Sequence, residues 1–249
     1  MDQGATGQAA LRRQMVETAR RMNSLGINQG TSGNLGARCP SGEGLLVTPS
    51  GLDYEAMTPA DIVAMAFDGT WRAPEGRRPS SEWRFHRDIL RARAEFGGVV
   101  HTHARYATTL ACQHLDIPAF HYMVAVAGGS DIRCAPYATF GTAALSDNAL
   151  AALEGRKACL LANHGMIACG RDLAEALKIA VEVETLAAQY WQVLQLGAPK
   201  LLPEAEMVRV LEKFRAGYGY ASGPEGGDAG PGEAGFGEAG GGGQGGTRG

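Results

Sequence analysis

The sequence predicts an α/β protein in which helices cover the faces of a mixed central sheet. Segments with helical and strand-like patterns alternate along the first 220 residues, as in α/β folds. Short hairpins interrupt the alternation, so we expect antiparallel as well as parallel strand pairs. Of the 36 glycines, 14 lie in residues 221–249, which carry almost no large apolar side chain. We therefore expect one domain over residues 1–220 and a disordered, glycine-rich tail over 221–249.

The first half of this domain predicts one helix and two hairpins. Apolar residues recur at helical spacing in residues 9–25, and Gly26 follows as a stop signal. Short apolar segments separated by glycine-containing turns then indicate paired strands. The strands expected are 35–38 with 45–48, and 62–67 with 71–72.

The second half predicts longer helices between buried strands. Residues 81–93 place apolar side chains at helical spacing, and residues 98–102 are rich in β-branched side chains, as a β-strand would be. Residues 172–196 form the longest periodic segment, with Asp172 at its start and glycine after it. The other helices expected are 105–115 and 204–214, and the other strands are 122–127, 159–162 and 166–169.

Charge and composition exclude several classes of protein. The formal net charge of −3 gives no basic field that would favour a nucleic-acid partner. The longest apolar runs have six residues, too few to span a membrane, and the N-terminus lacks the apolar core of a signal peptide. The five cysteines include no CxxC pair, which favours reduced thiols over a disulfide framework. We therefore expect a cytoplasmic protein with neither nucleic acid nor membrane as partner.

Three histidines stand where two predicted strands end. His101 and His103 close the strand 98–102, and alternate residues of a strand point to the same face, so their imidazoles should converge. His164 ends the strand 159–162 and precedes Gly165, which permits a tight turn. Three imidazoles with an open fourth position are typical of a catalytic zinc site. Half-buried histidines bonded to backbone carbonyls also fit this pattern.

A serine pair precedes an acidic residue at the start of the helix predicted over 81–93. Ser81 suits the N-cap position, which would leave Glu82 in the first turn. Amides at a helix N-terminus and two hydroxyls can hold a phosphate. Glu82 could act as a general base there if burial raises its pKa. A plain cap with a favourable acidic residue explains the same pattern.

Two further loops are small and rich in hydrogen-bond donors. They read GTSGN at residues 30–34 and TPSG at residues 48–51. Such loops can surround an anion with backbone N–H groups, although each is also compatible with an ordinary turn. Neither matches a nucleotide-binding glycine pattern. His86, His114 and His121 have weaker claims to a function, and His86 and His114 are expected to be packing or surface residues.

Six motifs give the chain a specific resemblance. They are GINQGTSGN, TPSGLDYEAM, RPSSEWRFH, VVHTHA, HYMVAVAGGSDIRCAPYATFGT and LLANHGMIACG, in this order. Together they resemble the class II aldolase/adducin family over residues 8–217. The resemblance implies a three-layer α/β/α sandwich and a homotetramer with active sites at subunit interfaces. It also implies an aldehyde-lyase that needs Zn²⁺ and cleaves a ketose 1-phosphate, L-fuculose 1-phosphate being the substrate expected. The products would be dihydroxyacetone phosphate and a small aldehyde such as L-lactaldehyde.

The resemblance also implies roles for individual residues. Glu82 is expected to be the catalytic acid/base, able to approach the metal when substrate is absent. Tyr122 is expected to reach the site of a neighbouring subunit and to protonate the aldehyde oxygen there. The expected zinc ligands are His101, His103 and His164. The expected phosphate contacts are Gly33, Asn34, Ser50, Gly51, Ser80 and Ser81.

Other functions within and beyond the family stay open at this point. A pentulose-phosphate 4-epimerase would use related chemistry, but such enzymes carry Asp where this chain has Glu82. A sugar-phosphate dehydratase is a further enzymatic alternative. A non-catalytic module like the adducin head would lack the metal ligands that this chain retains. The C-terminal end departs from the family pattern near Tyr218, which leaves the aldehyde specificity open.

Overall fold

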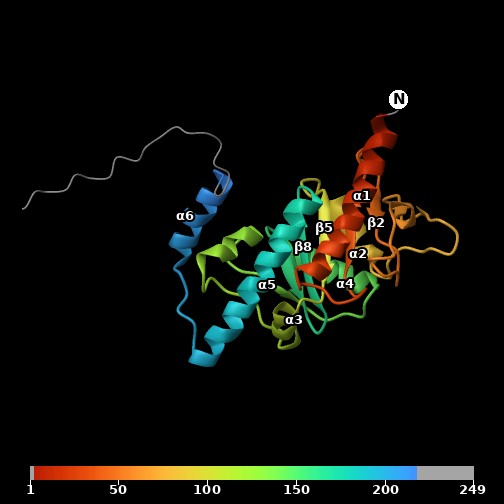
Figure 1. The fold of residues 1–249 in the computed structure, drawn as a ribbon. Coiled ribbons are helices and arrows are strands. Elements are labelled where there is room, and N and C mark those ends of the chain that lie inside the picture. Colours follow the sequence, from red (N-terminus) through yellow and green to blue (C-terminus); the bar gives the residue numbers. More distant parts are fainter. Residues whose placement is uncertain (1–2, 218–249) are drawn as a thin grey trace, which may run out of the picture. The chain divides into compact units, whose positions relative to one another are not determined.

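The computed structural model describes residues 3–217, and in these residues an eight-stranded mixed sheet lies between two layers of helices (Figure 1). The strand order is β4-β3-β2-β1-β5-β8-β7-β6. Neighbouring strands are antiparallel except for β6 and β7, which are parallel. The strands are β1 Asn34–Arg38, β2 Leu45–Val47, β3 Val63–Met65, β4 Trp71–Arg72, β5 Gly98–Thr102, β6 Cys134–Ala135, β7 Ala158–Leu161 and β8 Gly165–Gly170.

The helices divide between the two faces of the sheet. Helices α1, α3 and α5 pack on one face, and α2 and α4 pack on the other. The 3₁₀ segment η2 packs against α5 and α6. The helical segments are α1 Gln3–Ser24, η1 Pro59–Asp61, α2 Trp83–Ala92, α3 Arg105–Cys112, η2 Tyr122–Ala127, α4 Ala143–Ala152, α5 Leu173–Leu196 and α6 Glu204–Arg215.

The alternation of side chains along the central strands explains the three layers. In β5, Val99 joins the core under α2 and α4, whereas Val100 joins the core under α1, α3 and α5. In β8, Ile167 and Ala168 divide in the same way. Successive residues of a strand point to opposite faces, so strands that are apolar at every position need a helical layer on each side. The predicted mixed sheet and three-layer sandwich are therefore confirmed.

The residues from 122 to 127 correct one prediction, because they form η2 and not a strand. His121 Nδ1 accepts a hydrogen bond from the backbone of Met123, 3.2 Å away, and starts the turn. Gly128 ends it with a φ of +87°, a conformation that suits glycine. The apolar side chains bury against α5 and α6 without any strand partner for this segment among the described residues.

Three elements had no sequence prediction: the short 3₁₀ segment η1, helix α4 and strand β6. Helix α4 mixes alanine with polar residues and has little contrast between its faces, although Thr142 caps its N-terminus by accepting from the backbone of Leu145. Strand β6 has only two residues. Helix α4 lies on the face of the sheet that carries α2, and β6 forms the edge of the sheet beside β7.

The described residues up to Ala216 make one compact unit. Among them, no helix combines the length and the apolar character needed to cross a membrane. The predicted tail 221–249, Tyr218 and the end of the predicted domain at residue 220 lie outside the described residues.

Candidate active site and metal centre

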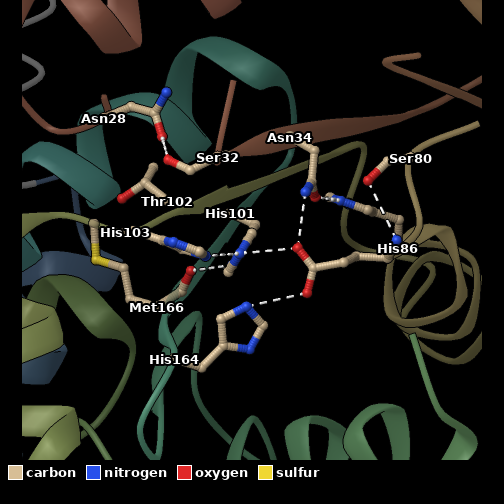
Figure 2. Close-up of polar contacts among 12 residues, drawn as sticks. Asn28, Ser32, Asn34, Ser80, His86, His101, Thr102, His103, His164 and Met166 are labelled. Atoms are coloured by element: carbon tan, nitrogen blue, oxygen red, sulfur yellow. Dashed lines mark hydrogen bonds and ion pairs between the residues drawn. The ribbon is translucent and has the colours of Figure 1, made fainter. Parts of the chain in front are cut away.

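The central strands bring three histidines to one point. His101 lies in β5, His103 follows that strand, and His164 lies in the turn between β7 and β8. Their ring centroids are 4.8–5.0 Å apart, so each ring is about equally close to the other two (Figure 2). The Nε2 atoms of His101 and His103 are 3.1 Å apart. The two residues of the HxH pair therefore share a face, as strand alternation predicts.

The turn that carries His164 differs in detail from the sequence prediction. The left-handed backbone conformation falls on Asn163, with a φ of +53°, and not on Gly165. Gly165 is needed for a different reason: a Cβ there would lie 2.5 Å from the carbonyl oxygen of Thr102 and 3.0 Å from Cδ2 of His103. The glycine therefore allows β8 to approach the histidine segment closely.

A backbone hydrogen bond orients His101. Its Nδ1 lies 2.9 Å from the carbonyl oxygen of Met166 in the neighbouring strand β8. A carbonyl can only accept, so Nδ1 carries a proton, and when the ring binds a metal it is Nε2 that offers the lone pair. Metal-binding histidines are commonly held by such a hydrogen bond on the other nitrogen.

Glu82 faces the histidines from the start of α2, on the other side of the cluster. It occupies the N-cap position of that helix, without a side-chain capping bond, so the prediction that Ser81 is the cap is wrong. The hydroxyl of Ser80 instead accepts from the backbone N–H of Glu82, 3.2 Å away. The Glu82 side chain is thereby free to turn inward, and the residue is only 5% exposed.

The carboxylate of Glu82 contacts three side chains from different elements. The Nδ2 of Asn34 donates to Oε2 over 3.0 Å. The Nε2 of His101 lies 3.2 Å from Oε2, and the Nε2 of His164 lies 3.1 Å from Oε1. The second contact lacks the alignment of a hydrogen bond, so Oε1 is buried without a hydrogen-bond partner among the described residues.

The electrostatic environment keeps this carboxyl ionised. Burial by itself would raise the pKa of Glu82, but the adjacent His101 and His164 outweigh burial and hold the pKa well below its usual range, so the raised pKa considered from the sequence is not found. Burial, followed by repulsion from the other two histidines, lowers the pKa of His103 to about 4. Near neutral pH the site therefore presents a carboxylate and a neutral His103, which are the ligand forms that metals need.

The donor set fits a divalent cation. One oxygen or nitrogen from each of Glu82, His101, His103 and His164 lies within 4.8 Å of the others. Ligands held tetrahedrally at about 2.0–2.1 Å from zinc stand about 3.3 Å apart, and three of the contacts within this set are 3.1–3.2 Å long. The orphaned Oε1 and the facing lone pairs would repel one another unless a cation lay between them. Three imidazoles and a carboxylate suit zinc or a similar transition metal.

The predicted phosphate-binding segments lie side by side next to Glu82. The segments around Ser50 and Ser80 are joined because Ser50 donates its N–H to Arg78 and Ser80 donates to Thr48, each over 3.0 Å. Gly51 has a φ of +67°, which opens this turn. Gly33 stands just before β1, packed so closely that a Cβ would lie 2.6 Å from the backbone oxygen of His101. Ser81, which follows Ser80, is exposed to solvent.

Asn34 has a position that the sequence did not anticipate. Its side chain lies between Glu82 and His86, with Oδ1 2.5 Å from the Nε2 of His86 (Figure 2). Its role as a phosphate contact stays a prediction. Sequence analysis expected only a packing or surface role for His86, but a signal was present: residues four apart on a helix share a face, and His86 lies four positions after Glu82.

Tyr122, the other residue predicted to move a proton, lies apart from the cluster. It begins η2, is 40% exposed, and its ring lies 4.8 Å from that of His121. An exposed tyrosine on a surface segment is compatible with the predicted contribution to a neighbouring subunit. That role stays a prediction.

Comparison with known proteins agrees with this geometry. Residues 13–191 match the model of the Class II Aldolase and Adducin N-terminal domain. The 5-methylthioribulose-1-phosphate/5-deoxyribulose-1-phosphate aldolase of Rhodospirillum rubrum is 61% identical over 206 residues, which cover 83% of this chain and 91% of that protein. The L-fuculose phosphate aldolase of Escherichia coli K12 is 47% identical over 206 residues, covering 82% and 94%.

A solved structure shows the same architecture. An L-fuculose 1-phosphate aldolase superposes with a TM-score of 0.80 at 39% identity, covering 83% of this chain and 96% of that chain. The chain belongs to the class II aldolase and adducin family, and its enzyme class is that of the metal-dependent aldehyde-lyases.

Proposed function

We propose that this chain is a zinc-dependent aldolase that cleaves a 5-substituted ribulose 1-phosphate to dihydroxyacetone phosphate and a two-carbon aldehyde. The observation that carries the proposal is the Glu82 carboxylate facing three histidines in a chain of this family. The preferred substrates are 5-methylthioribulose 1-phosphate and 5-deoxyribulose 1-phosphate. This preference rests on 61% identity to a protein named for them, against 47% to one named for L-fuculose phosphate.

The candidate substrates differ only at the aldehyde end. Cleavage between C3 and C4 releases the same dihydroxyacetone phosphate from each of them. The aldehyde is acetaldehyde from the deoxy sugar, its methylthio derivative from the thio sugar, and L-lactaldehyde from L-fuculose 1-phosphate. The loop before α4 carries the exposed aromatic rings of Tyr137 and Phe140, and Gly141 in this loop packs against the backbone oxygen of Ser81. Aromatic rings near the site suit an apolar methyl or methylthio group better than a hydroxyl.

The three histidines and Glu82 would hold the metal, and substrate oxygens could replace the carboxylate. When bound, the metal acts as a Lewis acid that stabilises the negative charge developing at the substrate's carbonyl and hydroxyl oxygens. The phosphate would lie against Gly33, Ser50, Gly51, Ser80 and Ser81. These contacts are remote from the bond that breaks, so they orient the substrate.

Two side chains would move protons. In the cleavage direction, Tyr122 of a neighbouring subunit takes the proton of the C4 hydroxyl as the C3–C4 bond breaks, and the bonding electrons pass to C3. Glu82, which must carry a proton in this direction, then delivers that proton to C3, completing dihydroxyacetone phosphate. Solvent returns the proton from Tyr122 to Glu82 between turnovers, so both groups regain their starting forms. In the synthetic direction Glu82 removes that proton and Tyr122 protonates the aldehyde oxygen. We propose a homotetramer, as the family resemblance implies, in which the exposed Tyr122 of one subunit reaches the site of its neighbour.

A substrate panel tests the proposal. Purified, zinc-loaded protein is assayed for dihydroxyacetone phosphate release from 5-deoxyribulose, 5-methylthioribulose and L-fuculose 1-phosphates, with zinc content measured in parallel. We expect about one zinc per chain and a kcat/KM at least about tenfold higher for the two ribulose derivatives, a difference of about 1.4 kcal/mol. No release from any of them would overturn the aldolase assignment.

L-fuculose 1-phosphate is the second candidate, favoured by the Escherichia coli relative and by the solved structure. A higher kcat/KM for this sugar would replace the ribulose derivatives as the preferred substrates. Ribulose 5-phosphate belongs in the panel as well, because its epimerisation without cleavage would favour the related epimerase.

A further inference from the structure

A fourth histidine stands behind the Glu82 carboxylate, outside the metal cluster. His86 lies on α2 and is fully buried, and its Nε2 is 2.5 Å from Oδ1 of Asn34. The Nδ2 of Asn34 in turn donates to Oε2 of Glu82 over 3.0 Å. Asn34 lies 48 positions before Glu82 and 52 positions before His86 in the sequence, and it joins the three side chains in one continuous hydrogen-bonded row.

The chemistry of this row permits only one arrangement of protons. An ionised carboxylate accepts only, so Asn34 must present its NH₂ group to Glu82 and its oxygen to His86. An amide oxygen also accepts only, so the Nε2 of His86 must carry a proton and donate it. The neutral ring then has a bare Nδ1, which is the His86 nitrogen that is buried without a partner among the described residues. A bare acceptor there costs less than a stranded N–H donor would.

Packing holds the imidazole in place. A Cβ at Gly36 of β1 would lie 2.7–2.8 Å from atoms of the His86 ring, so the glycine is required for the close approach of strand and ring. On another side, the ring of Phe85 lies 4.6 Å from that of His86. The ring therefore has little freedom, and neither has the amide that it contacts.

We propose that His86 is a positioning residue of the aldolase reaction, which donates from Nε2 to Asn34 and thereby holds the Asn34 amide in the one orientation that supports the Glu82 carboxylate. The inference rests on the proposed role of Glu82. Without the donor on His86, the Asn34 amide can rotate, and Oε2 loses its hydrogen bond. The carboxylate then spends less time within reach of the substrate carbon, and turnover falls.

A matched pair of variants separates hydrogen bonding from packing. His86→Gln keeps an N–H donor near the position of Nε2, whereas His86→Met has a similar length and no donor. With metal content equalised, we expect Met to lower kcat by about 10- to 100-fold with KM changed less than about twofold, and Gln to recover most of kcat. A packing role predicts the reverse order, because the apolar side chain is the better tolerated in a buried site. Equal kcat values for the two variants would also overturn the proposal.

A double-mutant cycle tests whether His86 acts on Glu82 through Asn34. In an Asn34→Ala background, His86→Met should lower kcat no further, because the group that it orients is gone. Additive losses would contradict the route. The unmodified protein provides a check that needs no variant to fold: ¹⁵N NMR should show His86 with a protonated Nε2 and a bare Nδ1, and the opposite tautomer would overturn the proposal.

Failure of this inference is distinguishable from failure of the proposed function. If the unmodified protein does not cleave any sugar of the panel, the function is wrong and the His86 variants are not informative for catalysis. If it does cleave and Glu82→Gln is inactive while His86→Met is fully active, the proposed function stands and the positioning role of His86 is wrong.

Discussion

Glu82 and Tyr122, the two residues that the sequence assigns to proton transfer, lie in opposite environments. Glu82 is 5% exposed and contacts side chains from β1, from β5 and from the β7–β8 turn. Tyr122 is 40% exposed at the start of a 3₁₀ segment on the surface. One position is enclosed by side chains of the same chain, and the other is open to solvent.

The difference fits the division of tasks that we propose for the site. A group that exchanges a proton with carbon needs a fixed position and a defined charge, and both come from burial among hydrogen-bond donors. In the proposed mechanism, the group that acts on the aldehyde oxygen comes from an exposed segment of a neighbouring subunit. We therefore expect substitutions near Glu82 to lower the rate of the chemical step. The effect of substitutions at Tyr122 should depend on how the subunits assemble.

Removal of the metal should lower activity more than any of the other changes. Its direct effect should fall on the groups around Glu82 and not on Tyr122. Chelation is expected to reduce aldolase activity to background, because the charge that develops on the substrate oxygens is no longer stabilised. Added zinc should restore it, and circular dichroism should show that the fold persists throughout. Undiminished activity after complete zinc removal, verified by elemental analysis, would contradict the assigned role of the four-residue cluster.

Glu82→Gln should come next, with kcat reduced by about 10²- to 10⁴-fold, because the amide cannot take or deliver the proton at C3. The three histidines remain, so bound zinc should change little. Steady-state kinetics and zinc content measured on the same preparation check both parts. Full turnover in this variant would remove Glu82 from the mechanism.

Tyr122→Phe should have a smaller effect, about 100-fold in kcat, because water can replace an exposed acid in part. Mixing this variant with Glu82→Gln under conditions that exchange subunits should restore about a quarter of the sites, since each such site takes Glu82 from one chain and Tyr122 from another. If two inactive variants stay inactive after verified exchange, the shared-site model is wrong.

The smallest expected effect is on the free energy of unfolding, and it comes from the burial of His86. Burial, followed by the charge on His101, lowers the pKa of His86 from 6.5 to about 3, so the folded protein holds this ring neutral. Unfolding lets it bind a proton below pH 6.5, so its contribution to stability is present above that pH and is lost as the pH falls toward 3. Between pH 7 and pH 5 the loss should be about 2 kcal/mol.

Urea unfolding of metal-free protein at the two pH values can measure this loss. The variant His86→Met should lose about 2 kcal/mol less than the unmodified protein, because the other histidines titrate in both. An equal loss in the two proteins would show that His86 is not held neutral by the fold.

Local patterns in the sequence were sufficient for most helices and for both predicted hairpins. Apolar periodicity and turn residues act over a few positions, and they predicted β1 with β2, β3 with β4, and the long helix α5. The same short-range logic placed His101 and His103 on one face of β5. It failed for residues 122–127, because an apolar run of six is compatible with a strand or with a helical turn, and the cap by His121 decided between them.

The interactions behind Glu82 could not be predicted from the sequence in this way. The Asn34 amide and the His86 ring are 52 positions apart, and no local pattern indicates that they meet. They meet because β1 pairs with β5 and α2 lies across these strands, which places the two residues beside each other. The orphaned Oε1 of Glu82 depends on the same long-range packing.

The sequence by itself determined the types of groups in this protein: three imidazoles, a carboxylate, small donor-rich loops and strands apolar enough to need cover on both faces. These properties belong to residue types and their short-range spacing. The tertiary structure decided the strand order, the meeting of Glu82 with the histidines and the row from His86 to Glu82. Such contacts are fixed by which distant segments pack together, because burial and pairing act between surfaces and carry no sequence signal of their own.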